Sequence, residues 1–174
     1  MTTKQLSSLF VFNTLLLSAE VNANQQWDVV NDSVMGGVST SHVMLTQAGL
    51  IFEGNISLEN NGGFASIRTD MKIHEQNPKA INLRVKGDGN TYQLRLRTAN
   101  ELDGPAFTHS FKTINNKWID INIAPKDFVL TFRGKKLEQQ PVVTLSKINQ
   151  LGFLIADSQE GHFKLEVDKI EFVD

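Results

Sequence analysis

The sequence predicts an all-β protein folded as an antiparallel β-sandwich or jelly roll. From Trp27 onward, apolar and polar residues alternate in many short runs, which is the pattern of strands with one buried face. Turn residues, mostly Gly, Asn and Asp, separate these runs. No strong helical period follows the first two dozen residues. Many short strands with such turns are typical of sandwiches and jelly rolls.

Two neighbouring runs, 81–86 and 92–97, alternate most strictly. Apolar residues occupy every second position of both runs, so each run has one apolar face. The residues between them, 87–90, are Gly-Asp-Gly-Asn, which tolerate the positive φ angles of tight turns. This pattern predicts that the two runs form a β-hairpin.

Further strands are predicted along the rest of the chain, in the alternating runs 50–58, 63–68, 118–123, 162–167 and 170–173. Residues 151–155 are almost wholly apolar, which predicts a strand buried on both faces. Because the polar positions of the alternating runs are often charged, each sheet should have one solvated face. The two apolar faces then pack against each other about 10 Å apart.

Composition limits the class of protein. The 174 residues, of which 40% are hydrophobic, suit one globular domain whose core is large enough to fold without crosslinks. The 17 basic and 19 acidic residues give a net charge of −2 and alternate along the chain. This argues against nucleic acid as the partner, because phosphate binding needs a concentrated positive face. Cysteine is absent, which excludes disulfides and thiolate metal sites.

The N-terminal segment resembles a secretory signal peptide. Lys4 precedes an apolar stretch over residues 6–17, and small residues beyond it mark a cleavage site after Ala23. This predicts a leader over residues 1–23 and a mature domain over 24–174 that is periplasmic or secreted. The alternative is an uncleaved amphipathic helix packed on the sandwich of a soluble cytoplasmic protein. The apolar stretch is too short and too interrupted to span a bilayer.

Two segments, 27–39 and 58–68, depart from simple alternation. Each contains a Gly-Gly pair beside Asn, Asp or Ser side chains that can hydrogen-bond exposed peptide groups. Each segment alone can be explained as an elaborate turn, and the two together are also a candidate binding site. We expect the two segments to lie side by side, with their polar side chains bonding the free peptide groups.

The first segment carries a longer motif. Trp27 is followed by Asn-Asp-Ser-Val-Met-Gly-Gly-Val-Ser at residues 31–39. In this motif, in the second segment and in residues 148–157, the chain resembles the complex I intermediate-associated protein 30 family, over about residues 27–173. The resemblance implies a jelly-roll sandwich similar to the galactose-binding-like domains. It also implies an assembly factor, since the mitochondrial members are chaperone-like proteins that engage an incomplete respiratory complex I. It implies no oxidoreductase activity.

The candidate site residues come mainly from the two segments. Asn31 and Asp32 are expected to bond amides of the first loop, and Asn60 and Asn61 those of the second. Their roles, binding a ligand or stapling the loops, stay open at this point. The full set of candidates is Asn31, Asp32, Ser33, Met35, Gly36, Gly37, Ser39, Asn60, Asn61, Gly62, Gly63, Phe64, Arg68 and Arg133.

Two arginines and two tryptophans have their own expected roles. Arg68 and Arg133 are each able to donate a bidentate pair of hydrogen bonds to a carboxylate such as Asp32. Trp27 and Trp118 are expected to anchor the core. A sugar platform would need a flat exposed aromatic ring beside amides and carboxylates, and the sequence does not indicate that exposure.

The sequence carries no recognised catalytic motif. It lacks a Gly-x-Gly-x-x-Gly after a strand, a Gly-Lys-Ser/Thr phosphate loop and a Gly-x-Ser-x-Gly elbow. The four histidines show no metal-ligand spacing, and Asp28 with Asp32 offers fewer oxygens than calcium prefers. The absence of these motifs predicts a non-catalytic domain without a cofactor or metal, although a structural calcium stays open. The family resemblance implies that it binds a protein such as a respiratory complex intermediate. A carbohydrate-binding module of galactose-binding-like fold is the alternative.

Overall fold

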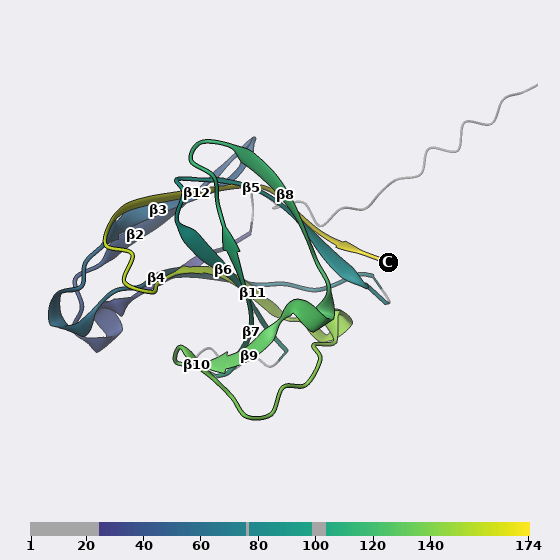
Figure 1. Ribbon diagram of the computed structural model, residues 1–174. Helices are drawn as coiled ribbons and strands as arrows, with labels where there is room; N and C mark the ends of the chain where they lie inside the picture. The colour runs from purple at the N-terminus through teal and green to yellow at the C-terminus, as the bar shows by residue number, and fades with distance from the viewer. Residues whose placement is uncertain (1–24, 76, 99–103) are drawn as a thin grey trace, which may run out of the picture.

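Two antiparallel sheets packed face to face form the protein (Figure 1). The computed structural model describes residues 25–75, 77–98 and 104–174, so the predicted leader over residues 1–23 lies outside it. The described residues form twelve strands and four short 3₁₀ helices. The predicted all-β antiparallel sandwich is confirmed.

Each sheet combines strands that are distant in the sequence. The seven-stranded sheet has the order β1 (Asp28–Asn31), β4 (Ala65–Asp70), β11 (Gln150–Ile155), β6 (Thr91–Arg97), β7 (Ala106–Lys112), β9 (Val129–Phe132) and β10 (Lys135–Lys136). The five-stranded sheet has the order β2 (Thr40–Thr46), β3 (Gly49–Ile56), β12 (Gly161–Val173), β5 (Ala80–Gly87) and β8 (Trp118–Ile123). The 3₁₀ helices are η1 (Asp32–Met35), η2 (Glu59–Asn61), η3 (Pro125–Asp127) and η4 (Leu145–Lys147).

Most of the predicted strands are present. The runs 50–58, 63–68 and 118–123 correspond to β3, β4 and β8. The last two runs join into β12, which carries a register shift between Val167 and Lys169. Every residue of β11 is buried, as the apolar run at 151–155 predicted.

The predicted hairpin over β5 and β6 is wrong. Both runs are strands, but β5 belongs to the five-stranded sheet and β6 to the seven-stranded sheet. The residues between them, 87–90, cross from one sheet to the other. The apolar faces of both strands point into the core, so their alternation is the same as in a hairpin. A turn with strict alternation on either side therefore does not distinguish hydrogen-bonded neighbours from strands that pack face to face.

The core lies between the two sheets and is rich in aromatic contacts. Phe52 meets Phe163 edge to face, with ring centroids 4.9 Å apart, and Trp27 stacks on Phe153 at 6.3 Å. Trp27 thus anchors the core as predicted. The same prediction is wrong for Trp118, which is 38% exposed on the outer face of β8.

Candidate functional site

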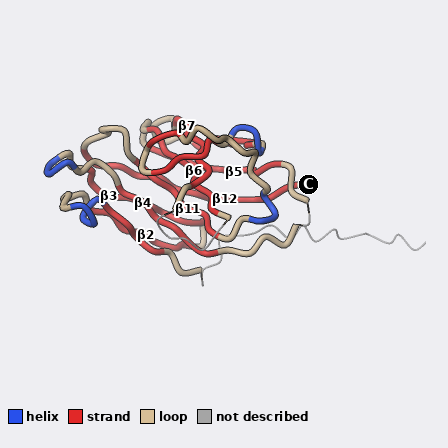
Figure 2. The backbone as a smooth tube through the Cα atoms, turned by 90° about the horizontal axis from the view of Figure 1, so that it is seen from below, coloured by secondary structure: helices blue, strands red, loops and turns tan. Residues whose placement is uncertain are grey.

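The two Gly-Gly segments meet at one end of the sandwich. Figures 1 and 2 both show η1 and η2 side by side at the end opposite the C-terminus, away from η3 and η4. The pairing of β1 with β4 brings them together, since Asn31 opposes Ala65 in register. One residue further on, the Asp32 amide donates to the Phe64 carbonyl at 3.3 Å. The expected juxtaposition of the two loops is therefore present.

The Asp32 carboxylate is fully buried and joins the loops. From its own loop it accepts hydrogen bonds from the Ser39 amide at 3.0 Å and from the Ser39 hydroxyl. From the other loop it accepts the amides of Gly63 at 2.6 Å and Phe64 at 3.2 Å. Four donors converge on one carboxylate, so a single side chain fixes the geometry of both loops.

The ionisation of Asp32 follows from these contacts. Burial by itself would raise the pKa of Asp32, but the hydrogen bonds from Ser39, Gly63 and Phe64 outweigh it and hold the pKa below its usual value. The group is therefore a carboxylate at neutral pH. As an acceptor with both oxygens engaged, it is a structural group and is not free to act as a base.

The four glycines divide into two roles. A Cβ atom on Gly37 would lie 2.4 Å from the Asp32 carboxyl carbon, and one on Gly62 would lie 2.6 Å from Asp32 Oδ2. These two glycines allow the backbone to pack against the carboxylate. Gly36 and Gly63 instead adopt φ angles of 90° and 126°, which side chains disfavour. Each Gly-Gly pair thus supplies one close approach and one left-handed turn.

Two further serines extend the junction. The Ser57 amide donates to the Ser39 hydroxyl at 3.0 Å, and the Ser57 hydroxyl accepts the Glu59 amide at 3.2 Å. Asn31 accepts the Ser41 hydroxyl at 2.6 Å, which ties the end of β1 to β2. Sequence reasoning missed Ser57 and Ser41, because each lies in a run that looks like an ordinary strand or strand end.

The other residues of the two loops are less involved than expected. Asn60 and Asn61 are exposed with φ angles of 55° and 59°, and neither side chain makes a hydrogen bond to any residue that the structure describes. The expectation that they staple the second loop is wrong, because Asp32 does so. Ser33 is exposed, and its carbonyl accepts the Gly36 amide at 3.1 Å.

The arginines do not reach Asp32. Arg133 occupies the turn between β9 and β10, at the opposite edge of the seven-stranded sheet from β1, and its guanidinium lies over the Phe132 ring. Arg68 lies within β4 opposite Asp28, past the end where the loops meet. The predicted ion pair with Asp32 is therefore wrong for both arginines. The carboxylate uses backbone amides and a hydroxyl instead.

Four large apolar side chains of the two loops are exposed. Val34 is 70% exposed, Met35 64%, Val38 48% and Leu58 39%. We call these four residues the apolar tip. They belong to the two loops that Asp32 holds together, so the junction presents apolar side chains on a fixed backbone.

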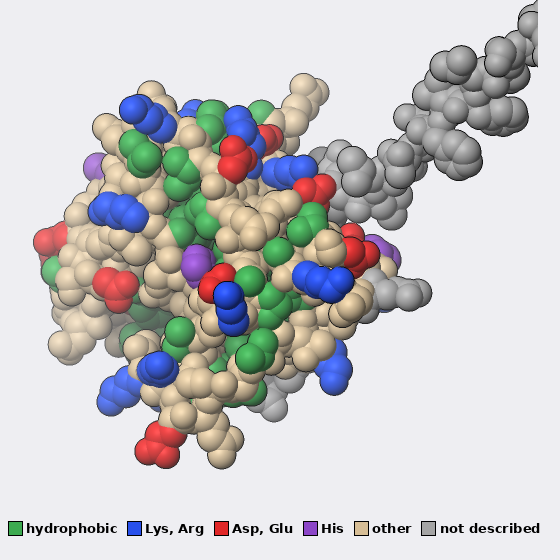
Figure 3. Space-filling model, turned by 45° about the vertical axis from the view of Figure 1, so that its right-hand side comes forward, with side chains coloured by type: hydrophobic (Ala, Val, Ile, Leu, Met, Phe, Trp, Pro, Cys, Tyr) green, Lys and Arg blue, Asp and Glu red, His purple; other side chains and the backbone are tan. Residues whose placement is uncertain are grey.

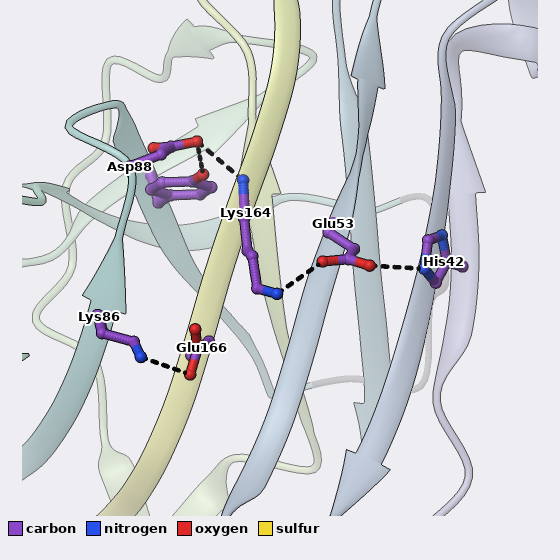
Figure 4. Close-up of polar contacts among 7 residues, drawn as sticks. His42, Glu53, Lys86, Asp88, Lys164 and Glu166 are labelled. Carbon is purple, nitrogen blue, oxygen red and sulfur yellow. Dashed lines mark hydrogen bonds and ion pairs between the residues drawn. The ribbon is translucent and has the colours of Figure 1, made fainter. Parts of the chain in front are cut away.

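A separate groove lies on the outer face of the five-stranded sheet, where its charged side chains pair with one another (Figure 4). Glu53 accepts hydrogen bonds from Lys164 and His42, both at 3.1 Å, and Lys86 meets Glu166 at 3.0 Å. The hydrogen bond from Lys164 is the main cause that lowers the pKa of Glu53. These groups satisfy each other, which favours a structural role for them.

Other kinds of site receive no support from the described residues. On the face seen in Figure 3, acidic and basic side chains are interspersed rather than gathered by sign. Within residues 25–75, 77–98 and 104–174, no three His, Asp or Glu side chains gather as metal ligands would. Nor does this part of the chain contain a helix with the length and apolarity needed to cross a membrane.

Comparison with models of protein families shows which family this chain belongs to. The family model of complex I intermediate-associated protein 30 matches residues 17–167. The chain belongs to the complex I intermediate-associated protein 30 family. The match includes both Gly-Gly loops and begins within the predicted leader.

Curated relatives agree with this assignment. A probable complex I intermediate-associated protein 30, mitochondrial, of Caenorhabditis briggsae is 26% identical over 155 residues, which is 77% of this chain and 46% of the relative. The complex I intermediate-associated protein 30, mitochondrial, of Drosophila melanogaster is 24% identical over 169 residues, covering 83% of this chain and 57% of that protein. The chain thus spans about half the length of these relatives.

Solved structures show the same fold. A family 11 carbohydrate-binding module of a Clostridium thermocellum cellulase aligns with a TM-score of 0.60 and 15% identity, over 90% of this chain and 92% of the module. A second structure of a family 11 module from that organism, in complex with a mixed-linked tetrasaccharide, aligns with a TM-score of 0.58 at 17% identity and covers 84% of this chain and 88% of its own. At these identities the likeness concerns the fold.

Proposed function

We propose that this chain is a non-catalytic protein-binding domain that docks on an assembly partner through the apolar tip. The observation that carries the proposal is the exposure of Val34 and Met35, at 70% and 64%, on loops that Asp32 holds rigidly. Apolar side chains on a surface attract a partner when they are contiguous. A fixed backbone adds affinity, because little conformational freedom is lost on binding.

The relatives suggest the kind of partner. Those reported above are named for association with an intermediate of complex I, and this chain shares with them the family's domain. We therefore propose a subunit or subassembly of respiratory complex I as the protein partner. The chain covers about half of the relatives' length, so the docking role is proposed for this domain alone.

The test is crosslinking in the native cells, followed by capture through a C-terminal tag and mass spectrometry. Recovery of complex I subunits supports the proposal. If no protein is captured, and complex I assembles normally in a deletion strain, the proposal fails. The N-terminal peptide of the captured chain also shows whether residues 1–23 are removed, and thus tests the proposed periplasmic or secreted location against a cytoplasmic one.

Carbohydrate binding is the second candidate, favoured by the fold shared with the family 11 modules. The aromatic residues favour it less. Trp27 is buried, and Arg84 and Lys86 lie over the Trp118 ring, 5.5 and 5.1 Å from its centroid. A glycan array, with and without calcium, tests this candidate. Specific binding of one glycan class that survives in variants of the apolar tip would favour it over protein docking.

A further inference from the structure

Three arginines share the outer face of the seven-stranded sheet. Arg68 lies on β4, and Arg95 and Arg97 lie on β6, with β11 between the two strands. Gly152 of β11 is in register with both Arg68 and Arg95. Since Gly152 has no side chain, nothing from β11 separates the two arginines. A Cβ atom there would lie 2.4 Å from the Ile67 carbonyl, so the backbone itself requires glycine at this position.

Arg97 and Arg95 differ in their partners. Arg97 donates to Gln150 Oε1 at 3.0 Å and to the Gly104 carbonyl at 3.3 Å. Gln150 in turn donates to Asp70 at 3.3 Å, which links Arg97 to an acidic group. The guanidinium of Arg95 makes no hydrogen bond or ion pair to any residue in the described ranges, although its Nε atom is buried.

The surroundings of Arg95 disfavour its positive charge. Burial, followed by repulsion from Arg97 and Arg68, lowers the pKa of Arg95 to about 10. Its cross-strand neighbour Thr108 gives no compensation, because the Thr108 hydroxyl is bonded to Thr131 at 2.8 Å. Buried charges in proteins are normally paired. On the outer face of the other sheet even Arg84, whose side chain is 40% exposed, pairs with Asp120 and Asp168.

We propose that Arg95, flanked by Arg68 and Arg97, binds a small oxyanion, either a carboxylate or a phosphate group. The planar guanidinium of an arginine can donate two parallel hydrogen bonds to the oxygens of a carboxylate or of a phosphate group. A bound anion would supply the missing partner of Arg95 and offset the repulsion among the three cations. The site lies on a sheet face and shares no residue with the apolar tip, so it is independent of the proposed docking function.

Thermal unfolding of three proteins tests the proposal: the wild type, Arg95→Met, and Arg84→Met as the control on the paired face. Each is unfolded in chloride, inorganic phosphate or acetate at equal ionic strength. We expect phosphate or acetate to raise the unfolding midpoint of the wild type and of Arg84→Met by at least about 3 °C relative to chloride. Arg95→Met should lose this increase and, in chloride, should unfold at or above the wild-type temperature. The more effective anion identifies the oxyanion class.

An equal rise in all three proteins would overturn the proposal, because salts such as phosphate also stabilise proteins generally by exclusion from the surface. No rise in the wild type with either anion would overturn it too. Should Arg95→Met fail to fold, the Nε–Hε resonance of Arg95 in the wild type gives an independent answer. Its saturable shift on addition of phosphate or acetate supports the site, and its constancy refutes it.

Discussion

Asp32 and Asp88 each hold a glycine-containing turn through several hydrogen bonds to one carboxylate, yet the two turns present different surfaces. Asp88 accepts the Asn90 amide at 2.9 Å and the Tyr92 hydroxyl at 3.0 Å. It also accepts the Lys164 amide at 2.8 Å (Figure 4). Paired charges line the groove beside Asp88, whereas exposed apolar residues surround the Asp32 junction.

Comparing the Asp32 and Asp88 turns separates the features that shape a turn from the surface that we propose for binding. A carboxylate that gathers backbone amides is common to both turns, so it explains their shape and not their use. What distinguishes the Asp32 junction is that Val34 and Met35 stay exposed where Asp88 has polar neighbours. The Asp32 network is therefore the support, and the apolar tip is the proposed contact surface.

The largest expected effect is that of Asp32→Ala. It leaves the amides of Ser39, Gly63 and Phe64 buried without their acceptor, so we expect a loss of about 4 kcal/mol in the free energy of unfolding. Asp88→Ala should lower the free energy of unfolding by only about 2 kcal/mol, because Asp88 is only partly buried. Urea unfolding of both variants measures the difference. An equal or reversed order would contradict the assignment of Asp32 as the main staple.

Alanine substitutions in the first Gly-Gly pair should cause the next largest loss in the free energy of unfolding. Gly37→Ala should lose about 2 kcal/mol of stability, because the new methyl group collides with the Asp32 carboxylate. Gly36→Ala meets no atom within 4 Å and should lose only about 1 kcal/mol, from its positive φ angle. The two variants are compared by urea unfolding. Equal losses would mean that close packing on Asp32 is unimportant.

Acid should weaken the Asp32 junction in a defined direction. Because the folded-state pKa of Asp32 lies below its ordinary value of 3.8, its contribution to stability is present above that value and is lost as the pH falls through the folded pKa. Asp32→Asn removes the titrating group. The stability difference between wild type and Asp32→Asn should be constant above about pH 5 and narrow below pH 4. A pH series of urea unfolding curves checks this, and a difference that widens in acid would refute it.

The strands were predictable wherever one face is buried, and the errors concern which strand pairs with which. β5 and β6 alternate identically whether they pair in one sheet or face each other across the core. The error for Trp118 is different, because the alternation of side chains along β8 already indicates the exposed position of this residue. It shares its face of β8 with Asp120 and Asn122, while Ile119 and Ile121 alternate with them toward the core. Counting positions along the strand would have placed Trp118 outside.

The sequence indicated which two loops form the candidate site, but not which hydrogen bonds join them. The sequence predicts that Asp32 bonds amides of its own loop, and it leaves open whether the role of Asp32 is to bind a ligand or to staple the loops. Its bonds to Gly63 and Phe64, 31 and 32 residues away, depend on the pairing of β1 with β4, which no local pattern specifies. For the same reason Asn60 and Asn61, which look like staples in the sequence, are exposed.

The smallest expected effect on stability belongs to the most direct test of docking. The double variant Val34→Ser, Met35→Ser should keep its stability to within about 0.5 kcal/mol per site, because both side chains are exposed. Val142→Ser is the matched control, since Val142 is 66% exposed on the connection between β10 and η4.

The decisive measurement is the affinity of these proteins for the captured partner. We predict at least about a tenfold loss for the double variant, which corresponds to about 1.4 kcal/mol, and no change for Val142→Ser. Unchanged affinity of a folded double variant would contradict the claim that the apolar tip is the docking surface.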